Sequence, residues 1–100
     1  MDMVTPYVVY ILSCADGTLY TGITTDLARR FAQHKAKKAA AYTAAHPVKK
    51  IAYAERCTSR GAALRREAEI KTWSREKKLA LIARNKKMDA GKTPAPAKKR

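Results

Sequence analysis

Two tyrosines lie where a hydroxyl group could transfer a proton. Tyr10 belongs to a run of β-branched and aromatic residues, and Tyr20 follows ten residues later. A tyrosine hydroxyl can donate a hydrogen bond, and it can act as a general base if cations or a metal lower its pKa from about 10. Because tyrosine also favours strands for packing reasons, each of the two alone is better explained as structural.

A cation and a histidine share one face of an expected helix. Arg30 and His34 are four residues apart, so they lie on the same side of a helix. Leu27 and Phe31 lie close to that face, which places the polar pair at the rim of the core, where a cleft would form. Arg29 is rotated away by about 100°. Taken alone, Arg30 and His34 are more simply explained as side chains whose polar ends extend to solvent than as a functional pair.

One acidic residue falls on an inward-facing stripe. Glu67 comes four residues after Ala63 and three before Ile70, which on a helix is the buried side. A carboxylate at the edge of a core needs a cation, a hydrogen-bond donor or a metal. The chain has only eight acidic residues, so this position requires an explanation. A salt bridge with Arg66 or Lys71 and a metal site are both consistent with it.

Other kinds of site find little support in the sequence. No phosphate-binding loop, dinucleotide-binding glycine pattern or serine elbow is present. Two cysteines are too few for a disulfide framework. The remaining zinc-ligand types lack the paired spacing of structural zinc sites, so we expect no zinc site; they are Cys14, His34, His46 and Cys57.

The elements that must position these residues are three strands and three helices. The first two strands form a hairpin around the turn signal Asp16-Gly17. The Ala/Lys-rich stretch from Lys35 to Ala45 has little to bury and is expected to be partly loop. We expect strands over 7–12, 18–24 and 48–54, a helix capped by Thr25 or Asp26, a helix from Thr58 or Ser59 to about Trp73, and a helix from Ser74 that carries Leu79, Ile82 and Ala83 on one side.

Charge and length limit the partners. The chain has 100 residues, 22 Lys and Arg against 8 Asp and Glu, and a net charge of +14. Such an excess of cations attracts polyanions, and nucleic acid is the leading candidate. No apolar run is long enough to span a bilayer and no secretory signal is visible, so we expect no membrane partner and a cytoplasmic location. Residues 1–85 are expected to fold as one domain, and 86–100 to be a disordered basic tail.

The candidate residues together form a pattern that is more specific than any one of them. It consists of Val8-Val9-Tyr10, Tyr20-Thr21-Gly22, Arg30, His34, and Glu67 with Lys71. This pattern resembles the GIY-YIG endonuclease superfamily, and within it the small single-domain bacterial UPF0213 group. The resemblance covers almost everything from Tyr7 to about Ile82. Val8-Val9 stand where the name motif has Gly-Ile, and their backbone role in a strand is unaffected by that change.

The resemblance implies a fold and an activity. The fold is α/β (α+β), with a three-stranded antiparallel β-sheet flanked by helices in the order ββαβαα. The activity is metal-dependent hydrolysis of nucleic-acid phosphodiester bonds, with Mg²⁺ or Mn²⁺ as cofactor. The substrate is expected to be DNA, in branched, nicked or single-stranded structures that arise in repair or recombination.

The resemblance also assigns roles to individual residues. Glu67 would hold the metal ion, Arg30 would donate to phosphate oxygens, and His34 would position the water or orient a tyrosine hydroxyl. The two tyrosines are equal candidates for the general base. The expected catalytic residues are Tyr10, Tyr20, Arg30, His34 and Glu67, and the expected nucleic-acid contacts are Arg29, Lys35 and Lys71.

Two alternatives compete with the nuclease hypothesis. One is a non-catalytic nucleic-acid-binding module of the same fold. It would not need a glutamate at a buried edge in a basic groove. The other is a basic accessory protein of the ribosome or nucleoid, for which charge alone suffices.

Overall fold

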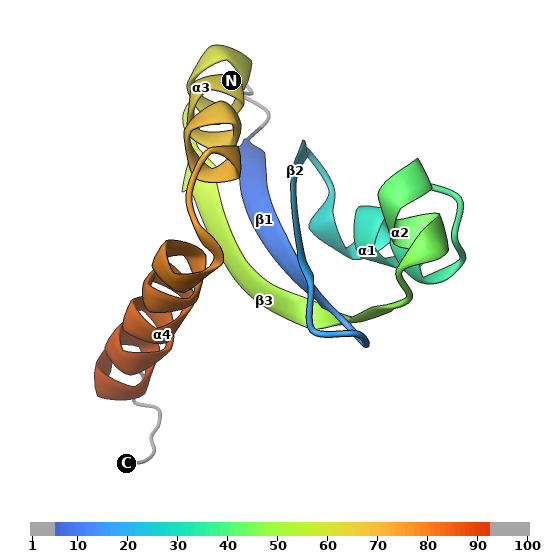
Figure 1. Cartoon of the computed structure of the whole chain (residues 1–100). Coiled ribbons are helices and arrows are strands. Elements are labelled where there is room, and N and C mark those ends of the chain that lie inside the picture. The colour runs from blue at the N-terminus through green and yellow to red at the C-terminus, as the bar shows by residue number, and fades with distance from the viewer. Residues whose placement is uncertain (1–5, 93–100) are drawn as a thin grey trace.

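The computed structural model describes residues 6–92 of the chain (Figure 1). A three-stranded sheet separates two pairs of helices. Helices α1 and α2 lie on one side of it, and α3 and α4 lie on the other (Figure 1). In chain order the elements are β1 (Tyr7–Cys14), β2 (Leu19–Thr24), α1 (Leu27–Lys35), α2 (Ala41–Ala45), β3 (Val48–Cys57), α3 (Arg60–Lys71) and α4 (Arg75–Lys92).

The sheet is antiparallel throughout, with β1 in the middle and the order β2-β1-β3. The hairpin between β1 and β2 turns at Asp16, whose carboxylate accepts a hydrogen bond from the Thr18 backbone N–H at 3.1 Å. Gly17 follows with a φ of 89°, a conformation that glycine adopts without strain. The expected three-stranded sheet, hairpin and ββαβαα order are therefore confirmed, with one additional short helix.

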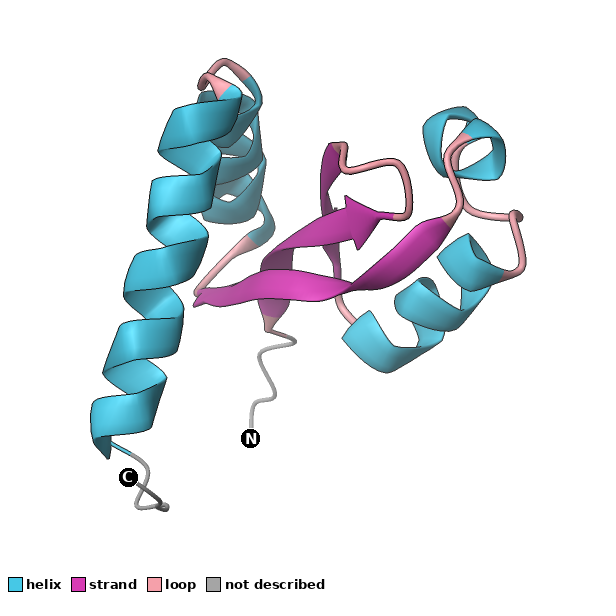
Figure 2. Ribbon diagram, turned by 60° about the horizontal axis from the view of Figure 1, so that its bottom comes forward, coloured by secondary structure: helices cyan, strands magenta, loops and turns pink. Residues whose placement is uncertain are grey.

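Alternate residues of β1 enter two separate clusters, because successive side chains of a strand point to opposite faces. Val9 and Ile11 join an apolar cluster with residues of α3 and α4, such as Ile70. Tyr10 and Leu12 point to the other face and join a second cluster, against which residues of α1 pack. The ribbon in Figure 2 shows the helices flanking the sheet.

Side-chain hydrogen bonds define where α1 and α3 begin. The Asp26 carboxylate accepts from the backbone N–H of Arg29 at 3.1 Å, which selects Asp26 over Thr25 as the cap of α1. Ser59 caps α3 in the same way through the N–H of Ala62. Among residues 6–92, no helix has the length and apolar character needed to cross a bilayer.

The structure adds one detail to the expected elements and corrects another. The stretch from Lys35 to Ala45 is partly loop as expected, over residues 36–40, but it also contains α2, which buries Thr43 completely. Within residues 75–85 of α4 the buried side chains are Leu81 and Ile82, whereas Leu79 is 40% exposed and does not contribute to the core as expected. Ala83 is exposed as well. The inward face of α4 is thus shifted by part of a turn, because its packing against the sheet, not its apolar pattern, sets the orientation.

The boundary of the expected basic tail also changes. Helix α4 continues to Lys92, past the expected limit at residue 85. The remainder of the expected tail, residues 93–100, lies outside the described residues.

Candidate active site

Tyr10 reaches the site across the neighbouring strand. It is buried, and its partner in the β1–β2 pairing is Gly22. A Cβ atom at Gly22 would lie 2.6 Å from the Tyr10 hydroxyl oxygen and 2.7 Å from Cζ. Only glycine therefore leaves room for this ring to lie over β2. This close approach explains why the second triplet of the sequence pattern ends in glycine.

A chain of hydrogen bonds begins at the Tyr10 hydroxyl. Its oxygen lies 2.8 Å from Nε2 of His34, and Nδ1 of His34 lies 2.7 Å from Oγ1 of Thr43. Thr43 in turn donates to the backbone carbonyl of Ala40 at 3.3 Å. Because its single proton is used there, the Thr43 oxygen accepts from Nδ1–H. We therefore assign Nδ1 as the protonated nitrogen and Nε2 as the acceptor of the Tyr10 hydroxyl proton.

The protonation states agree with this direction. Burial raises the pKa of Tyr10 to about 12, with further contributions from Tyr20 and Glu67, although the neighbouring Arg30 guanidinium opposes the shift. Burial and then the charge of Arg30 lower the pKa of His34. At neutral pH the pair consists of a tyrosine hydroxyl and a neutral imidazole. The sequence hypothesis required cations to lower the pKa of the tyrosine; at Tyr10, burial outweighs them.

Arg30 has an unpaired hydrogen-bond donor near Tyr10 and His34 in the described part of the chain. Its Nη1 donates to Gln33 at 3.1 Å. Its Nε is buried and, within the part of the chain that the structure describes, has no hydrogen-bond partner. A buried donor without a partner costs free energy, and an anionic oxygen would relieve that cost. Arg29 is exposed, as its position in the helical register predicts.

Glu67 supplies the carboxylate at the edge of the site. Its side chain is 18% exposed and pairs with Nζ of Lys71 at 3.1 Å. Its charge is the smallest of the contributions that raise the pKa of Tyr10, after burial and Tyr20. The described residues contain no group of three or more metal-ligand side chains. One carboxylate is nevertheless enough for Mg²⁺, which commonly retains several waters and binds substrate phosphate. The donor chemistry therefore fits.

Aromatic rings connect Tyr20 to the hairpin turn. Its ring centroid lies 5.1 Å from that of His34 and 5.9 Å from that of Tyr42. Tyr42 stacks on His46 at 4.1 Å and 15°. His46 Nδ1 lies 2.6 Å from a carboxylate oxygen of Asp16, and this hydrogen bond lowers the pKa of Asp16. Tyr20 is thus held in a row of rings anchored at the turn.

Tyr10, Tyr20, Arg30 and His34 lie close together, and Glu67 lies on α3, where its charge contributes to the raised pKa of Tyr10. The expected catalytic roles and the expected nucleic-acid contacts of Arg29, Lys35 and Lys71 stay predictions. Lys71 is engaged with Glu67. Lys35 is exposed on α1, with its ammonium 5.9 Å from the ring centroid of Phe31. Sequence reasoning missed Thr43 and Tyr42, which lie in the Ala/Lys-rich stretch. The stretch has no apolar periodicity that would single out these two residues. The only signal in the sequence is that they carry a hydroxyl and an aromatic group among alanines and lysines.

Comparison with known proteins agrees with this arrangement. Residues 6–80 match the GIY-YIG catalytic domain. A UPF0213 protein of Natronomonas pharaonis is 48% identical over 81 residues, which cover 81% of this chain and 95% of that protein. A UPF0213 protein of Staphylococcus haemolyticus is 47% identical over 74 residues, covering 74% and 90%.

A solved structure is similar as well. The solution NMR structure of a UPF0213 protein from Bacillus halodurans has a TM-score of 0.51 and 40% identity, and the match covers 78% of this chain and 83% of that one. The matched domain contains the Tyr10–His34 pair, Arg30 and Glu67. On these grounds, the chain belongs to the GIY-YIG family and is similar throughout most of its length to UPF0213 proteins.

Proposed function

We propose that this chain is a metal-dependent endonuclease that hydrolyses phosphodiester bonds of DNA, acting on branched, nicked or single-stranded structures formed in repair or recombination. The observation that carries the proposal is the buried Tyr10–His34 hydrogen bond beside the unpartnered Nε of Arg30. A buried hydroxyl needs an acceptor in any fold, so the weight of the argument lies on the second feature: a module that only binds nucleic acid would not need a buried, unpartnered guanidinium nitrogen beside that pair. Membership of the GIY-YIG family supports the same reaction class.

Tyr10 and His34 would activate the attacking water together. The water oxygen forms a bond to phosphorus, and its proton passes to the Tyr10 oxygen while the Tyr10 proton passes to His34 Nε2. The bond to the leaving oxygen breaks, and the imidazolium on His34 keeps its Nδ1–H on Thr43. Tyr10 never becomes a free phenolate in this scheme. The pKa of about 12 therefore does not prevent Tyr10 from acting as the general base.

Arg30 and Glu67 would handle the charge that develops on the phosphate. The free Nε–H of Arg30 can donate to a non-bridging oxygen, where a fixed donor stabilises the transition state. Glu67 would hold Mg²⁺ or Mn²⁺, with waters and the phosphate completing its coordination. When bound, such an ion would supply positive charge that stabilises the leaving oxygen, which then takes its proton from solvent.

The test is cleavage by the purified chain on a panel of labelled DNA substrates. We expect products with Mg²⁺ or Mn²⁺, and none when EDTA removes the metal. The panel compares continuous duplex, nicked, branched and single-stranded DNA, with one RNA of the same sequence as a check on the substrate class. Tight binding to the panel without cleavage in either metal would contradict the proposal and favour the non-catalytic binding module.

A further inference from the structure

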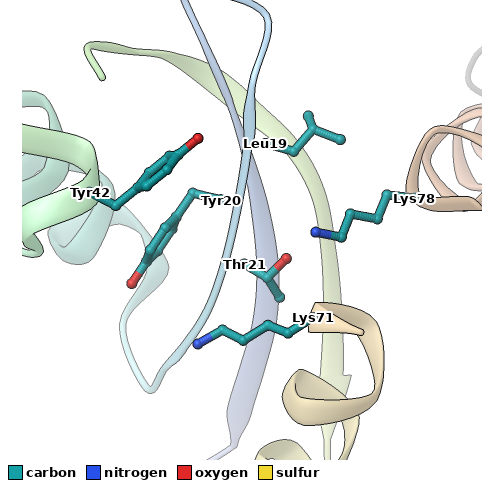
Figure 3. Close-up of a pocket in the computed structure, with 6 residues that line it drawn as sticks. All are labelled: Leu19, Tyr20, Thr21, Tyr42, Lys71 and Lys78. Atoms are coloured by element: carbon teal, nitrogen blue, oxygen red, sulfur yellow. The ribbon is translucent and has the colours of Figure 1, made fainter. Parts of the chain in front are cut away.

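A small pocket crosses the outer edge of the sheet beside the candidate active site. It encloses about 200 Å³, below the roughly 300–1,000 Å³ of pockets for drug-sized ligands. Strand β2 is an edge strand, so the pocket receives side chains from both sides of the sheet (Figure 3). The residues that line it are Leu19, Tyr20, Thr21, Tyr42, Lys71 and Lys78.

One wall of the pocket is aromatic and held in place. The rings of Tyr20 and Tyr42 are tilted by only 23° from each other, and Tyr42 is 37% exposed. His46 stacks behind Tyr42 and is itself bound to Asp16. Tyr42 lies between Tyr20 and His46, so a ligand meets only the part of this row of rings that stays exposed. Because the ring planes are fixed, that exposed part offers an apolar packing surface at little entropic cost. Every nucleobase has a flat face that suits such a surface.

Thr21 carries an independent sign that a ligand belongs here. The residue is 3% exposed, and its hydroxyl has no hydrogen-bond partner within residues 6–85. Burying a hydroxyl without a partner is unfavourable, so native proteins rarely leave one in that state. The side chain lies at the pocket, between the aromatic wall and the lysines (Figure 3). A polar edge of a base or a sugar hydroxyl would satisfy it.

Two cations complete the pocket on the opposite side. Lys71 comes from the end of α3 and Lys78 from α4, and both ammonium groups extend towards β2 (Figure 3). Ammonium groups bind phosphate as point charges. Lys71 also pairs with Glu67, so the pocket and the candidate active site share a side chain.

We propose that this pocket binds one unpaired nucleotide next to the phosphate that is cleaved. Its base packs on the Tyr20–Tyr42 wall, the Thr21 hydroxyl bonds to its polar edge or sugar, and its phosphate lies between the two lysines. A base inside a continuous duplex is covered on both faces and cannot enter so small a pocket. The position next to the cleaved bond rests on the proposed nuclease function; the preference for an unpaired nucleotide does not.

The test measures binding with EDTA present, so that no cleavage occurs. The probes are a fluorescent single-stranded oligothymidine and a duplex with the same number of phosphates, titrated with the full chain. Tyr42→Leu should weaken binding of the single strand by roughly 5- to 100-fold, the range found when one stacking aromatic is lost. Binding of the duplex should change less than twofold, because it depends on distributed charge.

Thr21→Val separates ligand binding from a structural role. It should weaken single-strand binding several-fold while the melting temperature stays constant or rises, because the variant removes a buried hydroxyl that has no partner. A lowered melting temperature with unchanged binding would overturn the assignment of Thr21.

A matched pair of lysine variants tests the cations. Lys78→Gln and Lys49→Gln each remove one charge, but Lys49 lies on β3, at the opposite edge of the sheet. Only Lys78→Gln should weaken binding of the single strand more than binding of the duplex.

Equal losses of affinity for the single strand and the duplex in Tyr42→Leu, Thr21→Val and Lys78→Gln would overturn the proposal. If selectivity is absent but the chain still cleaves DNA in Mg²⁺, the pocket proposal alone is wrong; if selectivity is present without cleavage, the nuclease proposal alone is wrong.

Discussion

The two faces of the sheet bury different kinds of side chain from the same strand. On the face covered by α3 and α4, Val9 and Ile11 lie in a mainly apolar cluster that includes Ile70 and the ring of Tyr53. On the face covered by α1 and α2, Tyr10 is buried to the same degree but bonds to His34. Apolar burial has no direction, so many arrangements of the first face would serve equally well. Polar burial requires each donor to meet an acceptor.

This difference indicates a division of labour between the faces. The apolar face stabilises the domain, and small changes of shape there should alter stability without altering chemistry. The polar face fixes a hydroxyl, an imidazole and a guanidinium in one geometry, so small changes there should alter chemistry first.

The largest effect is expected at Glu67. Glu67→Gln removes the carboxylate charge that contributes to the raised pKa of Tyr10, and it should abolish metal-dependent cleavage. DNA binding should be unchanged or tighter, because a negative charge leaves a basic surface. Glu69→Gln is the matched control, since Glu69 lies on the same helix but pairs with Arg66. Single-turnover cleavage should be close to the wild-type rate for Glu69→Gln only.

Arg30 comes next, with Arg29 as its neighbour in sequence. Arg30→Ala should lower the cleavage rate by about two to three orders of magnitude, as loss of one preorganised donor does in other hydrolases. Arg30→Lys should not restore it, because a point charge does not reproduce the planar guanidinium. Arg29→Ala should weaken DNA binding slightly without slowing cleavage, and this loss of affinity should vanish at high salt. Equal cleavage defects for the two alanine variants would leave only a diffuse basic surface.

The pH dependence should reflect His34. Its pKa in the folded chain lies below the ordinary 6.5, so the imidazole is neutral and can accept a proton above that value. Cleavage should be independent of this group above about pH 6.5, and it should fall about tenfold per pH unit below the lowered pKa. A rate profile at saturating protein between pH 4.5 and 8 measures this, in buffers of about constant ionic strength.

The same shift predicts the direction of a change in stability. Below pH 6.5 the unfolded chain binds a proton at His34 before the folded chain does. The free energy of unfolding should therefore be constant with respect to this group above about pH 6.5 and should decrease as pH falls below it. His34→Gln should remove this part of the pH dependence from thermal melts; a profile identical to the wild type would contradict the assignment.

A smaller effect is expected at Thr43, which positions His34 without contacting substrate. Thr43→Val should slow cleavage by about tenfold, because the imidazole loses the acceptor that holds its proton on Nδ1. Thr43→Ser keeps the hydroxyl and should retain most of the rate. Nitrogen NMR of His34 should show the Nδ1–H tautomer in the wild type and the serine variant, and a mixture in the valine variant.

The apolar face should show the reverse behaviour. Ile70→Ala leaves a cavity in the fully buried cluster and should lower the free energy of unfolding by about 2–5 kcal/mol. The cleavage rate per folded molecule should stay within about twofold of the wild type at a temperature below the transition. Denaturant unfolding gives the first quantity, and single-turnover cleavage gives the second. A large rate defect would mean that the two faces are coupled.

Local patterns were enough to predict most of the fold. The hairpin was predictable because Asp16-Gly17 is a turn signal between two strand-like runs. Helical spacing placed Glu67 towards the core and separated Arg30 from Arg29, and the structure has both features. These inferences succeeded because each depends on neighbours along the chain.

The rest depends on contacts between distant segments. Thr43 belongs to a five-residue helix in a stretch without apolar periodicity, and its importance arises only when His34 packs against it. The raised pKa of Tyr10 likewise follows from burial under α1, which the surplus of cations in the composition did not indicate. In α4, packing against the sheet selected Leu81 rather than Leu79 for burial.

On the polar face, the Tyr10 hydroxyl is the group proposed to take the proton of the attacking water. Tyr10→Phe removes only that oxygen and keeps the ring over Gly22. The decisive measurement is single-turnover cleavage of DNA by Tyr10→Phe in saturating Mg²⁺, beside wild type with the same melting temperature and DNA affinity. The account predicts a rate at least about a hundredfold lower, the smaller end of what a positioned general base contributes. A variant that folds, binds and cleaves at the wild-type rate would contradict it.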